Sequence, residues 1–157
     1  MKLYVDMDNV LTDFKQAVIY IGHEKALNDD TLKQDMYNAI EKEGPKFWNN
    51  MQWTPDGKDL WLILKPYKPI ILSSPGKFKY AKEGKLLWIS NNIPNTQVFF
   101  ETDKYRYANM NSVLIDDDIK NTEPWTLQGG QAILHTSKDN TEQELLQLLW
   151  KKPWLNL

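Results

Sequence analysis

The stretch YVDMDNVLTDF, residues 4–14, joins the end of an apolar run to three aspartates, Asp6, Asp8 and Asp13. Carboxylates that lie close together and lose water repel one another, which is costly unless a partner compensates. Two interpretations follow. The aspartates form an ordinary acidic turn that faces water, or they hold a cation and take part in chemistry.

Five short apolar runs that favour β-structure lie along the chain, at residues 2–5, 70–72, 97–100, 112–115 and 131–134. Each is nearly continuous, as expected for parallel strands that are covered on both faces. Intervening segments predict helices, including 77–92 and a helix at 141–152 that begins with a Thr141–Glu144 capping box. This alternation predicts an α/β fold with a Rossmann-like parallel sheet of about five strands flanked by helices.

The connection between the first two runs is much longer than a single crossover helix requires. Within it, residues 14–26 and 31–44 predict two helices, and Gly44-Pro45 ends the second. We therefore expect one domain over residues 1–157. A small helical cap, at about residues 15–66, is inserted after the first strand.

The composition excludes several classes of function. The chain has no cysteine, which excludes disulfides, thiolate metal sites and cysteine nucleophiles. A net charge of −2 and a single arginine, Arg106, argue against a stable nucleic-acid partner. No apolar run approaches the roughly 18 residues of a membrane span, and the N-terminus lacks the apolar core of a signal peptide. We expect a cytoplasmic monomer or homodimer without a membrane partner.

Polar side chains follow three of the predicted strands at the point where each strand ends. The segments are DMD at 6–8, SSPG at 73–76 and DDD at 116–118. Ligands of an open parallel sheet bind beyond the carboxyl ends of its strands. Any one of these segments alone suits a turn or a helix start, but their convergence predicts a site. Oxygen ligands without sulfur or clustered histidine favour Mg²⁺ before Ca²⁺ or Zn²⁺.

The same segments resemble the four motifs of the haloacid dehalogenase (HAD) superfamily of phosphohydrolases: DMDNVLTD, IILSSP, the lysine of EGKLLW, and VLIDDDIKN. More narrowly, the chain is similar to the 5′(3′)-deoxyribonucleotidases, which are Mg²⁺-dependent. The stretches that carry this similarity, GPKFWNNMQWTPDG, ILSSPGKFKYAKEGKLLW, VLIDDD and NTEPW, span nearly the whole chain. The resemblance implies a phosphomonoesterase that hydrolyses nucleoside monophosphates through an aspartyl-phosphate intermediate.

The resemblance also implies roles for the acidic residues. Asp6 would be the nucleophile and a ligand of the metal. Asp8 would protonate the leaving alkoxide and then deprotonate water, and its backbone carbonyl would bind the metal. Asp117, together with Asp116, would complete the metal site.

Ser73 and Lys85 would hold the phosphoryl oxygens, with Ser74 as the alternative because a Ser-Ser pair leaves the register open. Lys85 also has a simpler interpretation, as one of several solvated lysines on a helix. Phe47 and Trp48 fall where the nucleotidases carry aromatics that stack on the base, but they equally suit anchors of the cap.

Asp13 and Asn9 are interpreted from their effect on the local backbone. Asp13 suits an N-cap for the helix that follows. Asn9 departs from the glycine that the family commonly has after its second aspartate, although asparagine tolerates left-handed backbone angles.

Two other functions fit the same residues. One is a HAD phosphatase for another small phosphomonoester or for a 3′-phosphate at a nucleic-acid end, where lysines 77, 79, 82 and 85 would track the strand. The other is a catalytically silent binding module that retains the fold. The intact pair of Asp6 and Asp8 argues against the silent module.

Overall fold

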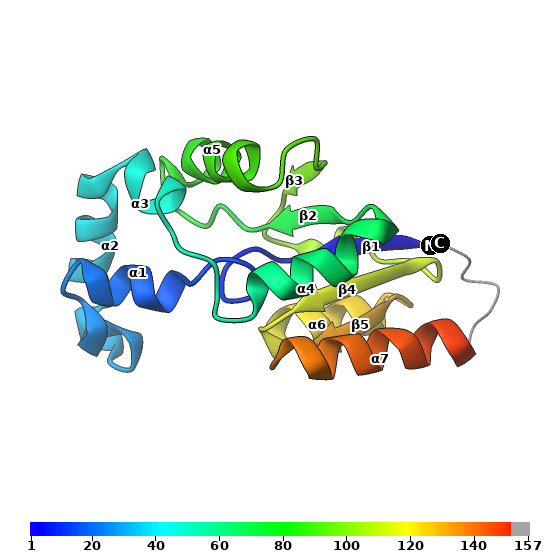
Figure 1. Ribbon diagram of the computed structural model, residues 1–157. Coiled ribbons are helices and arrows are strands. Elements are labelled where there is room, and N and C mark those ends of the chain that lie inside the picture. Colours follow the sequence, from blue (N-terminus) through cyan, green and yellow to red (C-terminus); the bar gives the residue numbers. More distant parts are fainter. Residues whose placement is uncertain (152–157) are drawn as a thin grey trace.

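The computed structural model describes residues 1–151, which form a five-stranded, all-parallel sheet flanked by helices (Figure 1). The strands are β1 (Lys2–Val5), β2 (Ile70–Ser73), β3 (Val98–Phe100), β4 (Ser112–Asp116) and β5 (Gln131–Leu134). Their order across the sheet is β3-β2-β1-β4-β5, and every pairing is parallel. The predicted α/β class and its five strands are confirmed.

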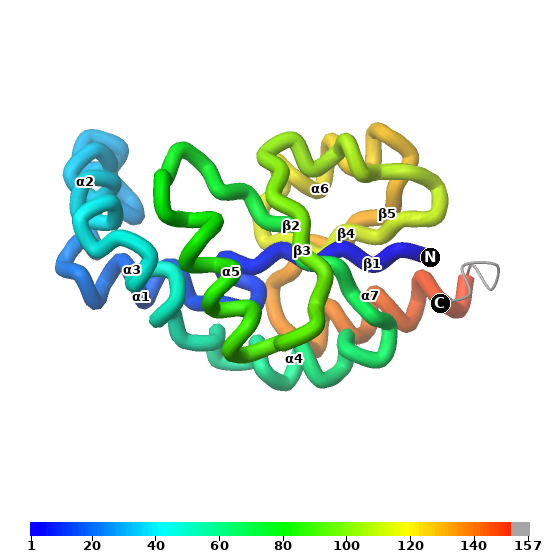
Figure 2. Tube along the Cα trace, turned by 90° about the horizontal axis from the view of Figure 1, so that it is seen from above, coloured from blue at the N-terminus to red at the C-terminus, as the bar shows by residue number. Residues whose placement is uncertain are grey.

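Alternate residues of the strands pack on opposite faces of the sheet. Leu3 and Val5 of β1 join the larger core cluster, whereas Tyr4 joins a smaller cluster with Trp125. The face that carries the larger cluster is covered by α4 (Gly57–Leu64), α5 (Ala81–Asn92) and α7 (Lys138–Lys151). The opposite face is covered by α6 (Ile119–Leu127) (Figure 2). Both faces are therefore buried, which explains why the strands read as continuous apolar runs.

The long connection after β1 contributes to two parts of the molecule. Helices α1 (Phe14–Tyr20), α2 (Lys33–Glu43) and α3 (Pro45–Asn49) lie beyond the carboxyl ends of the strands, at the left of Figure 1. Two 3₁₀ turns, Glu24–Leu27 and Asp30–Leu32, join α1 to α2. The last helix of the connection, α4, lies beside α7 on the sheet. Of the cap predicted at about residues 15–66, helices α1–α3 lie over the strand ends, and these three helices are called the cap below.

Three predicted helix boundaries were wrong. The helix predicted at residues 14–26 ends at Tyr20, and a separate 3₁₀ turn, Glu24–Leu27, follows Gly22, which has a φ of 84°. Residues 77–80 precede α5 as part of a loop rather than a helix. Gly76, just before them, has a φ of 55°, and the backbone N–H of Lys79 donates to Glu41 of the cap. Helix α7 begins at Lys138, where the Ser137 hydroxyl accepts from the Asn140 N–H, so the supposed capping residue Thr141 lies inside the helix. The end of that predicted helix, Lys152, falls outside the described residues.

The strand order creates a switch point between β1 and β4, because β2 and β4 lie on opposite sides of β1. Such points are where open α/β sheets bind ligands. Within residues 1–151, no helix is long and apolar enough to cross a bilayer.

Candidate active site

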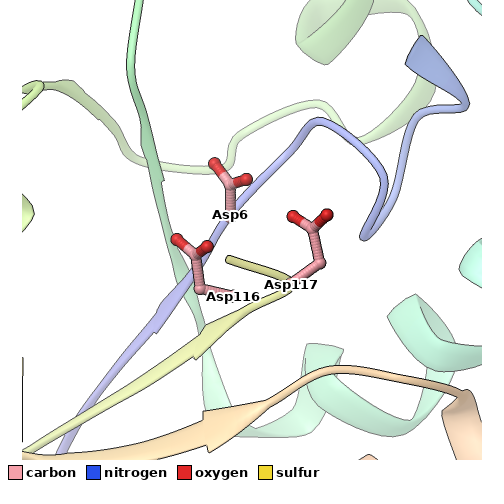
Figure 3. Close-up of side chains that lie close together, drawn as sticks. All are labelled: Asp6, Asp116 and Asp117. Carbon is pink, nitrogen blue, oxygen red and sulfur yellow. The ribbon is translucent and has the colours of Figure 1, made fainter. Parts of the chain in front are cut away.

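Three carboxylates meet at the carboxyl ends of the two central strands (Figure 3). Asp6 directly follows β1, and its backbone N–H donates to the Ile115 carbonyl of β4 at 2.9 Å. Asp116 is the last residue of β4, and Asp117 comes next. One oxygen from each of these three side chains lies within 4.8 Å of the others. The convergence that the sequence predicted at this edge is therefore present.

The loop after Asp6 folds back on itself and returns toward the cap. The Met7 carbonyl accepts from the N–H groups of Leu11 and Thr12, at 2.9 and 2.8 Å. Asn9 has a φ of 58°, the left-handed conformation that asparagine tolerates better than most residues. At the end of the loop, the Asp13 carboxylate accepts from the Gln16 N–H at 2.9 Å and caps α1, as predicted.

A lysine that the sequence analysis missed lies among the carboxylates. The ammonium of Lys104 donates to Asp6 Oδ1 at 2.6 Å and to Asp116 Oδ2 at 2.5 Å. It belongs to a 3₁₀ turn, Lys104–Tyr107, in the connection from β3 to β4, and its side chain is 1% exposed. Burial alone would lower the pKa of Lys104, but the two carboxylates together raise it, so the side chain is held as an ammonium.

Asp116 and Asp117 differ in how many of their acceptor sites are already used. Asp116 is fully buried and accepts from Lys104, from the Asp118 N–H and from the side-chain amide of Asn121. Burial and the nearby Asp6 raise its pKa to about 6. The pKa of Asp117 is raised to about 7, first by burial and then by Asp6 and Asp116.

Burial and repulsion from neighbouring carboxylates raise the pKa of both Asp116 and Asp117. A divalent cation would relieve that repulsion, and three carboxylates without nitrogen or sulfur suit Mg²⁺. Asp6 and Asp117 have the oxygens that are freest to bind it, because the hydrogen bonds of Asp116 engage both of its oxygens. Mg²⁺ keeps several waters in most sites, so two protein carboxylates suffice.

Asp8, the predicted proton donor, lies near a second buried lysine. The ammonium of Lys85 on α5 donates to Asp8 Oδ2 at 2.6 Å, to Ser73 Oγ at 2.9 Å and to the Ser74 carbonyl at 2.9 Å. Burial raises the pKa of the Asp8 carboxyl, and Lys85 opposes that rise. The simpler interpretation of Lys85 as a solvated lysine was wrong, because its side chain is 0% exposed.

A cleft of about 300 Å³ opens above these groups. Lys104 and Ser74 line it, whereas Lys85 and Ser73 lie beneath its surface. The predicted contacts of Lys85, Ser73 and Ser74 with a phosphoryl group remain predictions. The Ser74 hydroxyl lies 3.1 Å from the hydroxyl of Thr102.

The cap side of the cleft is an aromatic wall made of Phe14, Trp48 and Phe78. Phe14 and Trp48 are stacked, with centroids 5.8 Å apart and planes at 28°. Trp48 also meets Phe78 edge-on at 5.1 Å. Of the two aromatics predicted to contact a base, Trp48 lines the cleft but is only 2% exposed, so the half-buried rings of Phe14 and Phe78 are the more accessible part of the wall. Phe47 packs behind the wall, edge-on to Phe14 and Trp48, and lines a separate hollow between α1 and α3.

Comparison with known proteins adds a shared fold. No protein-family model and no curated protein matches the sequence. A hydrolase from Streptococcus pneumoniae TIGR4 is similar with a TM-score of 0.55 and 17% identity, over 92% of this chain and 97% of that one. The HAD domain of the effector protein Lem4 from Legionella pneumophila aligns at a TM-score of 0.44 and 12% identity, over 95% of this chain and 93% of that one. The similarity to the Streptococcus hydrolase shows a shared fold alone. The TM-score with the Lem4 domain is too low to support an inference.

Proposed function

We propose that the chain is a Mg²⁺-dependent phosphomonoesterase of the HAD type that hydrolyses nucleoside monophosphates. The observation that carries this proposal is the placement of Asp6, which lies at the switch point of the sheet between an ammonium and a second carboxylate. A hydrolase with the same fold supports the class of reaction. The aromatic wall of the cleft supports the substrate class.

In the first step, a carboxylate oxygen of Asp6 attacks phosphorus and the bond from phosphorus to the ester oxygen breaks. The leaving oxygen takes a proton from Asp8, which lies two residues further along the same loop. In the second step, Asp8 accepts a proton from water, and the resulting hydroxide attacks the aspartyl-phosphate. This releases inorganic phosphate and restores the Asp6 carboxylate.

Phosphoryl transfer depends on positioning and on neutralising charge more than on the strength of the nucleophile. Lys104 supplies a fixed positive charge beside Asp6, in a water-poor site where it is more effective than in solution. A bound Mg²⁺, held through Asp6 and Asp117, would supply further charge neutralisation at the phosphoryl oxygens. The raised pKa of Asp8 favours the protonated form that the first step requires.

The cleft also suits the leaving group. A volume of about 300 Å³ is at the lower end for small-molecule sites and suits a mononucleotide better than a polymer. Stacking of a base on an aromatic side chain stabilises binding by about 1–3 kcal/mol and tolerates any base. Lys85, which would have extended a track of lysines for a nucleic-acid strand, is buried and cannot contribute to one.

Phe78→Leu is expected to raise KM for a nucleoside monophosphate by about ten-fold, because this half-buried ring lines the cleft and stacking contributes mainly to ground-state binding. Hydrolysis of a phosphate ester without a base should change little. Steady-state kinetics on both substrates measures the difference. Phe47→Leu is the matched control, since it removes a ring behind the wall that does not line the cleft. Equal losses on both substrates would make the wall a structural feature and favour another small phosphomonoester.

The decisive experiment is a phosphate-release screen over nucleoside monophosphates, sugar phosphates and a 3′-phosphorylated oligonucleotide. We expect the nucleoside monophosphates to be hydrolysed with the highest kcat/KM. Chelation should abolish the activity, and added Mg²⁺ should restore it. Preference for the oligonucleotide would instead support the end-processing phosphatase. Full activity after exhaustive chelation would exclude the metal, and hydrolysis of none of these esters would favour a binding module.

A further inference from the structure

The ammonium of Lys85 is held by protein groups from two other segments of the chain. It has three acceptors: the Asp8 carboxylate from the loop after β1, the Ser73 hydroxyl from the end of β2, and the Ser74 carbonyl. These bonds are 2.6–2.9 Å long, which is the range of charge-assisted hydrogen bonds. An ammonium has three protons to donate, so the three acceptors saturate it.

The cap also fixes this side chain. Helix α5 lies so close to α3 that a Cβ on Gly84 would stand 2.5 Å from the Pro45 carbonyl oxygen and from Trp48 Cβ. The next residue is Lys85, whose ammonium lies 4.9 Å from the centroid of the Trp48 ring. Trp88, one turn further along α5, donates its indole N–H to the Met51 carbonyl at 2.8 Å. The position of Lys85 is thus set by the core and the cap together.

The two buried lysines contact different carboxylates of the site. Lys104 contacts Asp6 and lines the cleft, whereas Lys85 contacts Asp8 from below the cleft surface. The bond from Lys85 engages Oδ2 of Asp8. Among the described residues, Oδ1 has a single long contact, 3.4 Å from the Thr12 hydroxyl. One oxygen of Asp8 is therefore anchored, and the other is left for proton transfer.

We propose that Lys85 is a positioning residue that fixes the orientation of Asp8 and makes no contact with the phosphoryl group. This inference rests on the proposed phosphatase function and departs from the phosphate-binding role that the sequence resemblance implies for Lys85. Contact with the phosphoryl group falls to Lys104. Lys85 acts on the reaction through the oxygen of Asp8 that donates the proton.

The two roles predict different dependence on the leaving group. A nucleoside monophosphate releases an alkoxide, which needs a proton from Asp8, whereas 4-nitrophenyl phosphate releases a stable phenolate, which does not. A residue that binds the phosphoryl group serves both substrates equally. A residue that positions Asp8 accelerates the first step of nucleotide hydrolysis far more than the first step of 4-nitrophenyl phosphate hydrolysis.

The test compares Lys85→Met with wild type in single-turnover experiments on both esters. We expect release of nucleoside to slow by about 10²–10³-fold and the first-turnover release of 4-nitrophenolate to stay within about three-fold. The inhibition constant of inorganic phosphate should also remain within about three-fold. Lys82→Met is the matched control on an exposed position of α5, and circular dichroism verifies that each variant is folded.

A double-mutant cycle with Asp8→Asn gives a second readout. If Lys85 acts only through Asp8, the double variant should be no slower on the nucleotide than Asp8→Asn alone. Equal losses on both esters, or clearly weakened inhibition by phosphate, would assign Lys85 to phosphoryl binding and overturn the inference. Wild-type protein that hydrolyses neither ester would instead overturn the proposed phosphatase function, and the inference with it.

Discussion

Asp6→Asn is expected to lower kcat on a nucleoside monophosphate by about 10⁴-fold or more while leaving the protein folded. The amide keeps the shape of the side chain but is not a nucleophile toward phosphorus. Lys104 retains its bond to Asp116 in the variant, so the buried ammonium keeps a charged partner. Phosphate release under saturating substrate, together with thermal unfolding, measures both parts of the expectation.

Asp13→Asn provides the matched control for this variant. Asp13 lies on the same loop, and its side chain caps α1, a role that asparagine performs about equally well. We expect the control to retain activity. Turnover near the wild-type value in folded Asp6→Asn protein would exclude the covalent mechanism and require water to attack phosphorus directly.

Much of the fold could be predicted from local patterns because the sheet is buried on both faces. Each strand is then a short continuous apolar run, and such runs are visible without any tertiary information. The start of α5 was missed for a tertiary reason. The loop that precedes it is fixed by the Glu41 carboxylate of the cap, which lies far away in the sequence.

The acidic part of the site was also predictable, because parallel strands bring their carboxyl ends to one edge. Asp6 and Asp116 could be placed together from that rule alone. Lys104 could not, since the 3₁₀ turn that carries it has no periodicity, and its ammonium reaches the site only through the path of the chain from β3 to β4. Its one available signal was a lysine in the connection that leads into the acidic strand end.

The aromatic pair Phe47-Trp48 shows a similar limit. Neighbouring residues of a helix point about 100° apart, so both cannot face one cleft equally. Which of the two faces the cleft depends on how α3 packs against α5, where the close approach at Gly84 fixes the indole of Trp48.

Lys104→Met is expected to lower kcat/KM by about 10³-fold, because the proposed mechanism loses the buried fixed charge beside Asp6. It should also destabilise the fold. The variant leaves the carboxylates of Asp6 and Asp116 buried and facing one another without the ammonium between them. Breaking a buried ion pair by removing one partner typically costs about 3–5 kcal/mol. Urea denaturation at pH 7, in the absence of divalent cations, measures this loss.

The pH dependence of the destabilisation caused by Lys104→Met tests whether its origin is electrostatic. Burial raises the pKa of Asp116 to about 6 even with Lys104 present, well above the usual value for an aspartate, and removing the ammonium raises it further. A carboxyl whose pKa is higher in the folded state binds protons preferentially there, so the unfolding free energy increases as pH falls through that pKa. We therefore expect the difference in unfolding free energy between wild type and Lys104→Met to decrease as the pH is lowered from 7 to 5. Lys120→Met, at an exposed position of α6, should show neither effect. A gap that is independent of pH would mean that Lys104 stabilises the fold by packing of its alkyl chain, and wild-type kcat/KM in the variant would remove it from the proposed mechanism.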